Sequence, residues 1–337
     1  MPAKTEAIAE PLLAALHRDT GLHDVTYAAE PAPLGGGFWA DLVTFRLAGA
    51  SPELAGELVA KIAPSRSHGE REALVQAAVV AQGYLSPPVL ASGAGPRADG
   101  WYFVMPRAVG APPLSAASAG AVVRAVPSLA LHLPTLLADL LVQLHQLDPA
   151  PLRDALCARA AWPVDVDDLV ADLATAADGL DDTDLAETIR TMLAARPQPD
   201  ARRVVCHGDF HPLNIIVGAD GATVVDWTAA RIGPPAFDVA YTALLLAHPP
   251  IAVGPALAPP LRLAGRWLAR RFVAGYRRRA RAAGWDLPAD ELAWYTQLHA
   301  ARILIDATTH DAADGHPYAM LTGPASAVLA TRRAIRC

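Results

Sequence analysis

A β-type stretch inside a helical half constrains this chain more than any other feature. Residues 204–227 read VVCHGDFHPLNIIVGADGATVVDW, and the segment GADGA between its two later apolar runs predicts a hairpin turn. Five polar side chains interrupt the apolar runs: His207, Asp209, His211, Asn214 and Asp226. The sequence on either side, such as LALHLPTLLADLLVQLHQLD, has apolar residues at helical spacing. The chain therefore has to pack a small, polar β unit among helices.

The first third of the chain has a different, mixed pattern. We expect a helix at 5–19, two strands around the glycine-rich turn within 27–49, a strand at 56–64, a helix at 67–84 capped by Ser67, and strands at 87–93 and 101–109. From about residue 110 the pattern is mostly helical. This predicts an α+β protein with an N-terminal domain at 1–107 and a helical domain at 108–337.

Composition limits the class of protein. Hydrophobic residues make up 53% of the 337 residues and charged residues 18%, which favours a well-packed core. The net charge of −6 predicts no general attraction to nucleic acid or to an anionic membrane. The three cysteines are far apart in sequence and form no CxxC pair, so we expect neither a zinc site nor a disulfide framework. With no signal peptide or spanning helix expected, the sequence predicts a cytoplasmic protein.

Lys61 stands out because the chain has 26 arginines and only two lysines. It lies within GELVAKIAP, an apolar run that reads as a strand. A compact ammonium group is not interchangeable with a forked guanidinium, so Lys61 is a candidate for a specific role. The alternative is a lysine at a strand end that extends its amine to water.

Three interpretations of the polar stretch compete. Asp209 and Asn214 could cap turns, which explains one or two of the five side chains. His207 and His211 could bind a metal from one face of a helix, but Gly208 and Pro212 make a regular helix improbable there. The third is phosphoryl transfer, which needs an acceptor for a hydroxyl proton, oxygen ligands for Mg²⁺ and a cation for the phosphates.

The stretch HGDFHPLNIIV followed by VVDW closely resembles the catalytic core of the aminoglycoside phosphotransferase and choline kinase-like family. Kinases of this fold carry H-R-D-x-x-x-x-N and then D-F-G, and here Gly208 takes the place of the arginine. The segment GPPAFDVAY is similar to the family's G-x-P-x-x-D-L-A. The resemblance, which spans roughly residues 27–245, implies a protein-kinase-like fold with a small antiparallel-sheet lobe, one main helix in it, and a larger helical lobe.

The resemblance also implies a role for each matching residue. Asp209 would act as the catalytic base, with His207 and Asp238 bracing its loop. Asn214 and Asp226 would bind Mg²⁺. The residues expected to hold ATP are Lys61, Glu72 as its partner (with Glu70 as the alternative), Gly35, Gly36, Gly37, Met105 and Arg107.

Two departures from the family pattern are visible. Trp39 and Ala40 stand where relatives often carry a Ser-Asn pair, and Thr228 stands where many carry an acid. The core positions are filled, so the resemblance implies an ATP-dependent phosphotransferase acting on a small-molecule hydroxyl, for example of an aminoglycoside antibiotic. A kinase of a metabolic sugar or amino alcohol, or a catalytically weak nucleotide-binding module, are the alternatives.

Two charge runs remain without an assignment. Residues 163–189 contain nine acids and no base, and residues 262–281 contain eight arginines and no acid. Solvated helix faces explain both. Alternatively, the acidic run, with Asp306, Asp311 and Asp314, attracts a cationic acceptor, or Trp267, Trp285, Trp294 and Tyr295 line a pocket for a less polar one.

Overall fold

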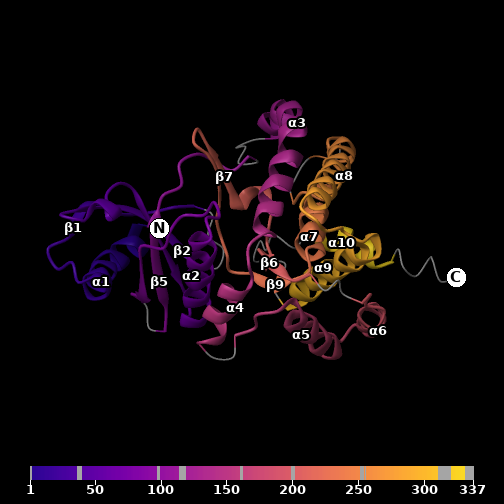
Figure 1. Cartoon of the computed structure of the whole chain (residues 1–337), viewed down its shortest axis with the longest axis horizontal. Coiled ribbons are helices and arrows are strands. Elements are labelled where there is room, and N and C mark those ends of the chain that lie inside the picture. The colour runs from indigo at the N-terminus through magenta and orange to yellow at the C-terminus, as the bar shows by residue number, and fades with distance from the viewer. Residues whose placement is uncertain are drawn as a thin grey trace. The chain divides into compact units, whose positions relative to one another are not determined.

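The computed structural model describes residues 2–35, 40–96, 99–113, 119–159, 162–198, 202–250, 254, 256–309 and 320–330 (Figure 1). The chain divides into two compact units. Unit 1 comprises Met1–Pro112, Ala150–Trp162 and Asn214–Ala230, and unit 2 comprises Pro113–Pro149, Pro163–Leu213 and Arg231–Cys337. The sequence predicted a boundary between two lobes after residue 107, and that boundary stays a prediction.

Unit 1 is built on a five-stranded antiparallel sheet. Its strands are β1 (Thr26–Pro33), β2 (Asp41–Ala48), β3 (Leu58–Ala63), β4 (Ala91–Ala94) and β5 (Trp101–Pro106), in the order β1-β2-β3-β5-β4. Helix α1 (Pro2–Thr20) precedes the sheet, the short 3₁₀ helix η1 (Pro52–Leu54) precedes β3, and α2 (Arg66–Ala81) follows β3. The expected order of three strands, a helix and two strands is confirmed.

The two faces of this sheet carry separate apolar clusters because successive residues of a strand point to opposite faces. Leu58, Ala60 and Ile62 of β3 pack in a cluster with the buried residues of α1. Val59 packs with Phe103 and with Ala73 of α2 in a second cluster. Lys61 has the same parity as Val59, so the strand directs its side chain to the α2 face.

Helix α2 begins two residues earlier than the sequence indicated. Its N-cap is Ser65, whose hydroxyl accepts from the His68 N–H at 3.5 Å, and the prediction of Ser67 as the cap is wrong. Ser65 has the extended backbone of an N-cap, with φ −133° and ψ 149°, whereas Ser67 is already helical. Gly69 allows the first turn to approach the sheet, because a Cβ there would lie 2.7 Å from Cβ of Trp101.

The remainder of unit 1 consists of α4 (Ala150–Cys157), which packs on α2, and the hairpin of β7 (Ile215–Gly218) and β8 (Gly221–Val224). The hairpin turn falls where GADGA predicted it. The 3₁₀ helix η2 (Pro212–Asn214) leads into β7.

Unit 2 is mostly helical, as expected for the second half of the chain. Its helices are α3 (Ala119–Leu144), α5 (Val166–Asp178), α6 (Thr183–Ala194), α7 (Ala236–Ala247), α8 (Ala258–Ala282), α9 (Ala289–Thr309) and α10 (Thr322–Ala330). Strands β6 (Val204–Cys206) and β9 (Arg231–Gly233) form a two-stranded antiparallel sheet. Helix α8 packs on α3 and α7, whereas α5 and α6 pack on α9. Among the described residues, no helix has the length and apolar character needed to cross a bilayer.

Candidate active site

A charged cluster built on the buried Lys61 and Glu72 lies on the α2 face of the sheet in unit 1. Lys61 Nζ lies 2.7 Å from Glu72 Oε1 and 3.0 Å from Asp226 Oδ1. Burial disfavours the ammonium, but Glu72 and Asp226 outweigh it and hold the pKa of Lys61 above its ordinary value. Burial also raises the pKa of the Glu72 carboxyl, against the opposing effect of Lys61. The alternative partner, Glu70, is instead bound by Arg66 and Arg159.

Thr228 completes this cluster. Its Oγ1 lies 2.7 Å from Asp226 Oδ1, 3.1 Å from Glu72 Oε2 and 3.4 Å from the Lys61 ammonium. The hydroxyl can accept from Lys61 and donate to one carboxylate. The residue that departs from the family's acid is therefore a neutral link between two carboxylates.

Helix α2 holds the segment after Asp226 through a residue that the sequence did not single out. Arg71 donates from Nη1 to Thr228 O at 2.9 Å and from Nη2 to Ala230 O. The backbone N–H of Trp227 donates to Glu72 Oε1 at 3.2 Å. Two neighbouring residues of α2 thus fix residues 227–230. Among 26 arginines, no local pattern marks Arg71.

Asn214 and Asp226 are brought together by the β7–β8 hairpin. Ile215 pairs with Val224, and the N–H of Val225 donates to Asn214 O at 2.9 Å. Asp226 has a φ of 68°, an uncommon conformation for a residue other than glycine and one that recurs at functional sites. A carboxylate and an amide oxygen at one strand end are hard ligands of the type that Mg²⁺ prefers.

The other nucleotide-site predictions have mixed outcomes. Gly35 is exposed, whereas Gly36, Gly37 and Trp39 lie outside the described residues. Met105 is buried, and its sulfur accepts from Gln76 Nε2 at 3.4 Å. Arg107 forms an ion pair with Glu57 at 2.6 Å. Their roles toward a nucleotide stay predictions.

The loop that carries Asp209 belongs to unit 2 and is held by a buried carboxylate. Asp238, fully buried in α7, accepts from the N–H of His207 at 2.7 Å and from the N–H of Gly208 at 2.8 Å. Gly208 has a φ of 78°, which explains why a glycine stands in this turn. His207 is buried, and its Nδ1 accepts from the Asp209 N–H at 3.3 Å. The loop backbone is thus fixed on both sides of Asp209.

His145 of the α3 C-terminal extension and Tyr276 of α8 extend this support. His145 Nε2 lies 3.2 Å from Asp238 Oδ2, and Nδ1 lies 2.6 Å from the Tyr276 hydroxyl. Trp285 Nε1–H donates to Tyr276 at 3.3 Å, so the hydroxyl is free to donate to Nδ1 and the Nε2–H to Asp238. Cys206 lies close to His145 and Asp238, a combination of metal-ligand types. Since both His145 nitrogens and both Asp238 oxygens are already hydrogen-bonded, the cluster acts as a brace. The sequence predicted the helix before His145 but gave neither His145 nor Tyr276 a role.

Asp209 is half-buried and held as a carboxylate. Burial would raise its pKa, but His211, the Tyr241 hydroxyl and Arg302 together lower it below the ordinary value. His211 Nε2 lies 3.4 Å from Asp209 Oδ2. The His211 Nδ1 accepts from the Leu213 N–H at 3.2 Å, which assigns the proton to Nε2. An ionised carboxylate so placed can orient a hydroxyl group.

Many acids of the 163–189 run have structural partners. Asp167 binds Arg196 and Arg203, and Arg190 binds Asp178 and Glu187. Asp168 and Asp182 accept backbone N–H groups at the starts of α5 and α6. Of the acceptor-site candidates, Asp306 is half-buried, Asp311 and Asp314 lie outside the described residues, and Trp285, Trp294 and Tyr295 are buried, whereas Trp267 is exposed.

Comparison with solved structures gives the same fold at low sequence identity. A thermostable mutant of aminoglycoside phosphotransferase APH(4)-Ia, solved with AMP-PNP and hygromycin B, has a TM-score of 0.57 at 18% identity, covering 90% of this chain and 94% of that one. A macrolide 2'-phosphotransferase from Brachybacterium faecium has a TM-score of 0.55 at 18% identity, covering 92% and 97%. Amicoumacin kinase, solved with AMP-PNP, Ca²⁺ and its ligand, has a TM-score of 0.57 at 14% identity, covering 89% and 88%.

A search of curated proteins found no match. The model of the phosphotransferase enzyme family, APH, matches residues 32–282, well over half of the chain and a span that includes Lys61, Asp209, Asn214, Asp226 and Asp238. The fold is the mixed α+β, kinase-like fold that the sequence predicted. The chain belongs to the APH phosphotransferase family and is a small-molecule phosphotransferase.

Proposed function

We propose that the protein transfers the terminal phosphoryl group of ATP to a hydroxyl group of a small molecule, with Mg²⁺ as the metal. The observation that carries this proposal is the buried ion pair of Lys61 and Glu72, which the partly exposed Asp226 joins. Removing an ammonium and a carboxylate from water costs several kcal/mol per ion, and apolar side chains of similar volume would pack the site as well. A buried lysine and glutamate at this position are therefore explained if the Lys61 ammonium binds a ligand.

The side chains present fit the nucleotide and the metal. Asn214 and Asp226 offer oxygen ligands for Mg²⁺, and Lys61 offers a point charge for the phosphates. Gly35 to Gly37 would cover the phosphates, with Met105 and Arg107 bordering the base. When bound, Mg-ATP supplies the phosphoryl group and a metal ion that neutralises its charge. Glu72 and Thr228 orient the Lys61 and Asp226 side chains.

On the acceptor side, Asp209 is the proposed base. It accepts a hydrogen bond from the substrate hydroxyl, aligns that oxygen, and takes the proton late in transfer. Phosphoryl transfer demands accurate positioning more than covalent chemistry from the protein. Asp238 and His207 supply it by holding the backbone of residues 207–209.

The proposed acceptor class is a hydroxylated antibiotic such as an aminoglycoside. This rests on family membership, since the solved relatives bind hygromycin B or amicoumacin or are named for macrolides. The paired acids of the 163–189 run weaken the argument for a polycationic acceptor in particular.

The test is release of ADP from Mg-ATP across a panel of aminoglycosides, macrolides, peptide antibiotics, sugars and choline-like alcohols. The Asp209→Asn variant serves as the control. Turnover with one antibiotic class, abolished in the variant, supports the proposal. Turnover confined to sugars or amino alcohols would replace the antibiotic by a metabolic acceptor. Mg-ATP binding without turnover of any acceptor would favour a nucleotide-binding module.

A further inference from the structure

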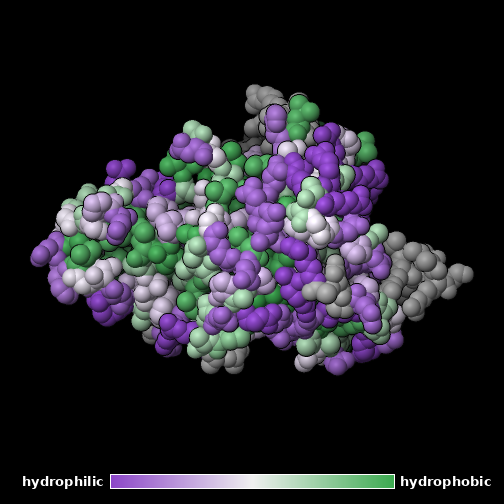
Figure 2. Space-filling model, viewed as in Figure 1, coloured by the Kyte–Doolittle hydropathy of each residue, from purple (hydrophilic) through white to green (hydrophobic). Residues whose placement is uncertain are grey.

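The outward face of α8 is a continuous strip of arginine. Arg262, Arg266, Arg270, Arg277 and Arg281 recur at spacings of four and seven residues, which place them on one side of a helix, and Arg278 lies at the edge of that side. The opposite side packs on α3 and α7. Helix α8 contains neither Asp nor Glu. Figure 2 shows hydrophilic residues gathered over this helix.

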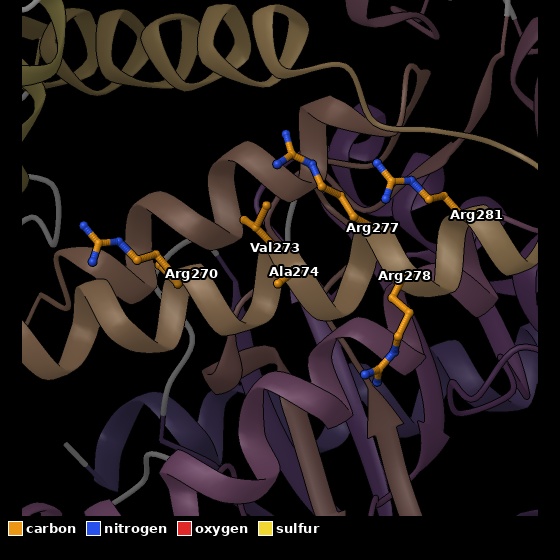
Figure 3. Close-up of a pocket in the computed structure, with 7 residues that line it drawn as sticks. Arg270, Val273, Ala274, Arg277, Arg278 and Arg281 are labelled. Carbon is orange, nitrogen blue, oxygen red and sulfur yellow. The ribbon is translucent and has the colours of Figure 1, made fainter.

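An open hollow of about 790 Å³ lies along the strip, and the described residues that line it all belong to α8 (Figure 3). The guanidinium groups of Arg270, Arg277 and Arg281 extend from one side of the helix, and Arg278 extends from the other edge. Val273 and Ala274 form the floor between them. The face thus offers an apolar base flanked by positive charge.

Most of this charge has no counterpart in the part of the chain that the structure describes. Arg279 and Arg281 bind Asp139 and Asp286, but Arg262, Arg266, Arg270, Arg277 and Arg278 have no carboxylate at ion-pair distance there. Like charges one helical turn apart repel each other. Binding of an external anionic surface would therefore relieve this repulsion.

Two large apolar side chains on the same face indicate a macromolecular partner. Leu263 is 72% exposed and Trp267 41% exposed, and the guanidinium of Arg271 lies 4.9 Å from the Trp267 ring centroid. Exposed leucine and tryptophan side chains would add nothing to the affinity for a small inorganic anion. Arginine and tryptophan are, however, the residues most enriched at the centres of protein interfaces.

The second unassigned charge run supplies a surface of opposite sign. Around the α5–α6 turn, Asp172, Asp178, Asp181, Asp182, Asp184 and Glu187 are exposed. Arg190 binds two of them, but Asp172, Asp181 and Asp184 have no cation at ion-pair distance among the described residues. Within unit 2, α5 and α6 lie at the opposite end from α8 (Figure 1).

We propose that the arginine face of α8 docks on the acidic α5–α6 surface of a second copy of this chain. Placing the two surfaces at opposite ends of one unit allows an antiparallel two-fold pair to form both contacts at once. From Arg262 to Arg281 the strip spans about 30 Å, so at a width of about 10 Å it covers roughly 300 Å². Two such contacts give roughly 600 Å² per partner, at the lower end of the size range of specific interfaces. The net charge of −6 and the acidic surface itself oppose binding of nucleic acid or an anionic membrane. This inference is independent of the proposed catalytic function.

The experiment is sedimentation velocity of the full chain over a wide concentration range, at salt concentrations of about 0.05 M and 0.5 M. We expect a dimer at low salt that weakens at high salt. The Arg270→Glu, Arg278→Glu double variant and the Asp181→Arg, Asp184→Arg double variant should each dimerise at least roughly tenfold more weakly. An equimolar mixture of the two should recover association, because each then meets an opposite surface. A Lys4→Glu, Arg46→Glu variant, with the same charge change as the first, should behave as wild type.

Three results would overturn the inference. The first is a wild-type monomer at every concentration at low salt. The second is a dimer that both double variants leave intact, or a mixture of the two that stays monomeric. The third is an α8 variant whose only defect is loss of binding to phosphatidylglycerol vesicles or to a DNA duplex, which would assign the face to a polyanion.

Discussion

The Lys61 cluster in unit 1 and the Asp209 loop in unit 2 are stabilised in different ways. Lys61 is held by side-chain charges, those of Glu72 and Asp226. The loop is held by its own backbone N–H groups, which donate to the buried Asp238. Charged side chains can exchange one partner for another when a ligand arrives, whereas a buried N–H that loses its acceptor costs free energy. We infer that the first arrangement can adapt to a ligand and that the second maintains a fixed geometry.

The largest effect expected from this comparison is on catalysis at Asp209. Asp209→Ala removes the proton acceptor and should lower kcat by roughly 10²- to 10⁴-fold. Affinity for Mg-ATP should change little, because the proposed nucleotide ligands are other residues. Steady-state kinetics combined with calorimetric titration of Mg-ATP would measure both, and an unaltered kcat would remove Asp209 from the mechanism.

Because Asp238 fixes the loop, removing the Asp238 carboxylate should lower the free energy of unfolding. Asp238→Ala leaves the N–H groups of His207 and Gly208 and the His145 ring without their acceptor. At about 1–3 kcal/mol for each unsatisfied buried donor, we expect the free energy of unfolding to fall by about 3 kcal/mol or more. Urea denaturation would measure it. The exposed Asp154→Ala provides a matched control, and equal stability of the two variants would contradict the brace.

His299, a buried histidine that bonds the α7 backbone at Phe237, should make the stability of unit 2 sensitive to acid. Burial, reinforced by Arg302, lowers the pKa of His299 to about 3, from an ordinary value near 6.5. Between these values the unfolded chain binds a proton that the folded chain does not, so stability falls as the pH drops below about 6.5. From pH 7 to pH 5 this residue should cost about 2 kcal/mol of unfolding free energy.

Denaturant titrations of wild type and His299→Gln at several pH values would isolate that contribution. The glutamine amide can donate to the Phe237 carbonyl as His299 Nε2 does at 2.8 Å. The variant should lose less stability than wild type between pH 7 and pH 5. Parallel curves would show that His299 does not titrate as described.

The smallest effect concerns Arg71, which ties α2 to the segment after Asp226. Arg71→Met removes the donors to Thr228 O and Ala230 O, and we expect kcat to fall roughly tenfold, equivalent to about 1.4 kcal/mol. Arg71→Lys keeps one donor and should recover part of the loss. Hydrogen exchange at residues 226–230 gives a readout that needs no substrate, and it should accelerate in Arg71→Met. Unchanged exchange in Arg71→Met would contradict the inference that Arg71 holds the segment after Asp226.

Sequence reasoning succeeded where the signal is local. The Lys61 strand, the hairpin turn at residues 218–222 and the spacing from Asp209 to Asn214 are properties of short segments. It failed where contacts join distant segments. Arg71 meets Thr228 across 157 residues and His145 meets Tyr276 across 131, distances at which a single sequence carries no pairing signal.

Two shorter-range features were missed for other reasons. Strand β9 has only three residues, too few for a period of two to be recognised. Ser65 and Ser67 are the same residue type and both suit an N-cap, so backbone conformation rather than residue type decides which of them caps α2.

The most direct test of the account is Mg-ATP binding by Lys61→Met, measured by calorimetry at neutral pH. If the buried ammonium serves the phosphates, the variant should bind Mg-ATP at least roughly tenfold more weakly than wild type, a difference of about 1.4 kcal/mol, while remaining folded. Lys4→Met, at the other lysine of the chain, should bind as wild type does. A folded Lys61→Met protein with unchanged affinity would contradict the central claim that the cluster exists to hold the nucleotide.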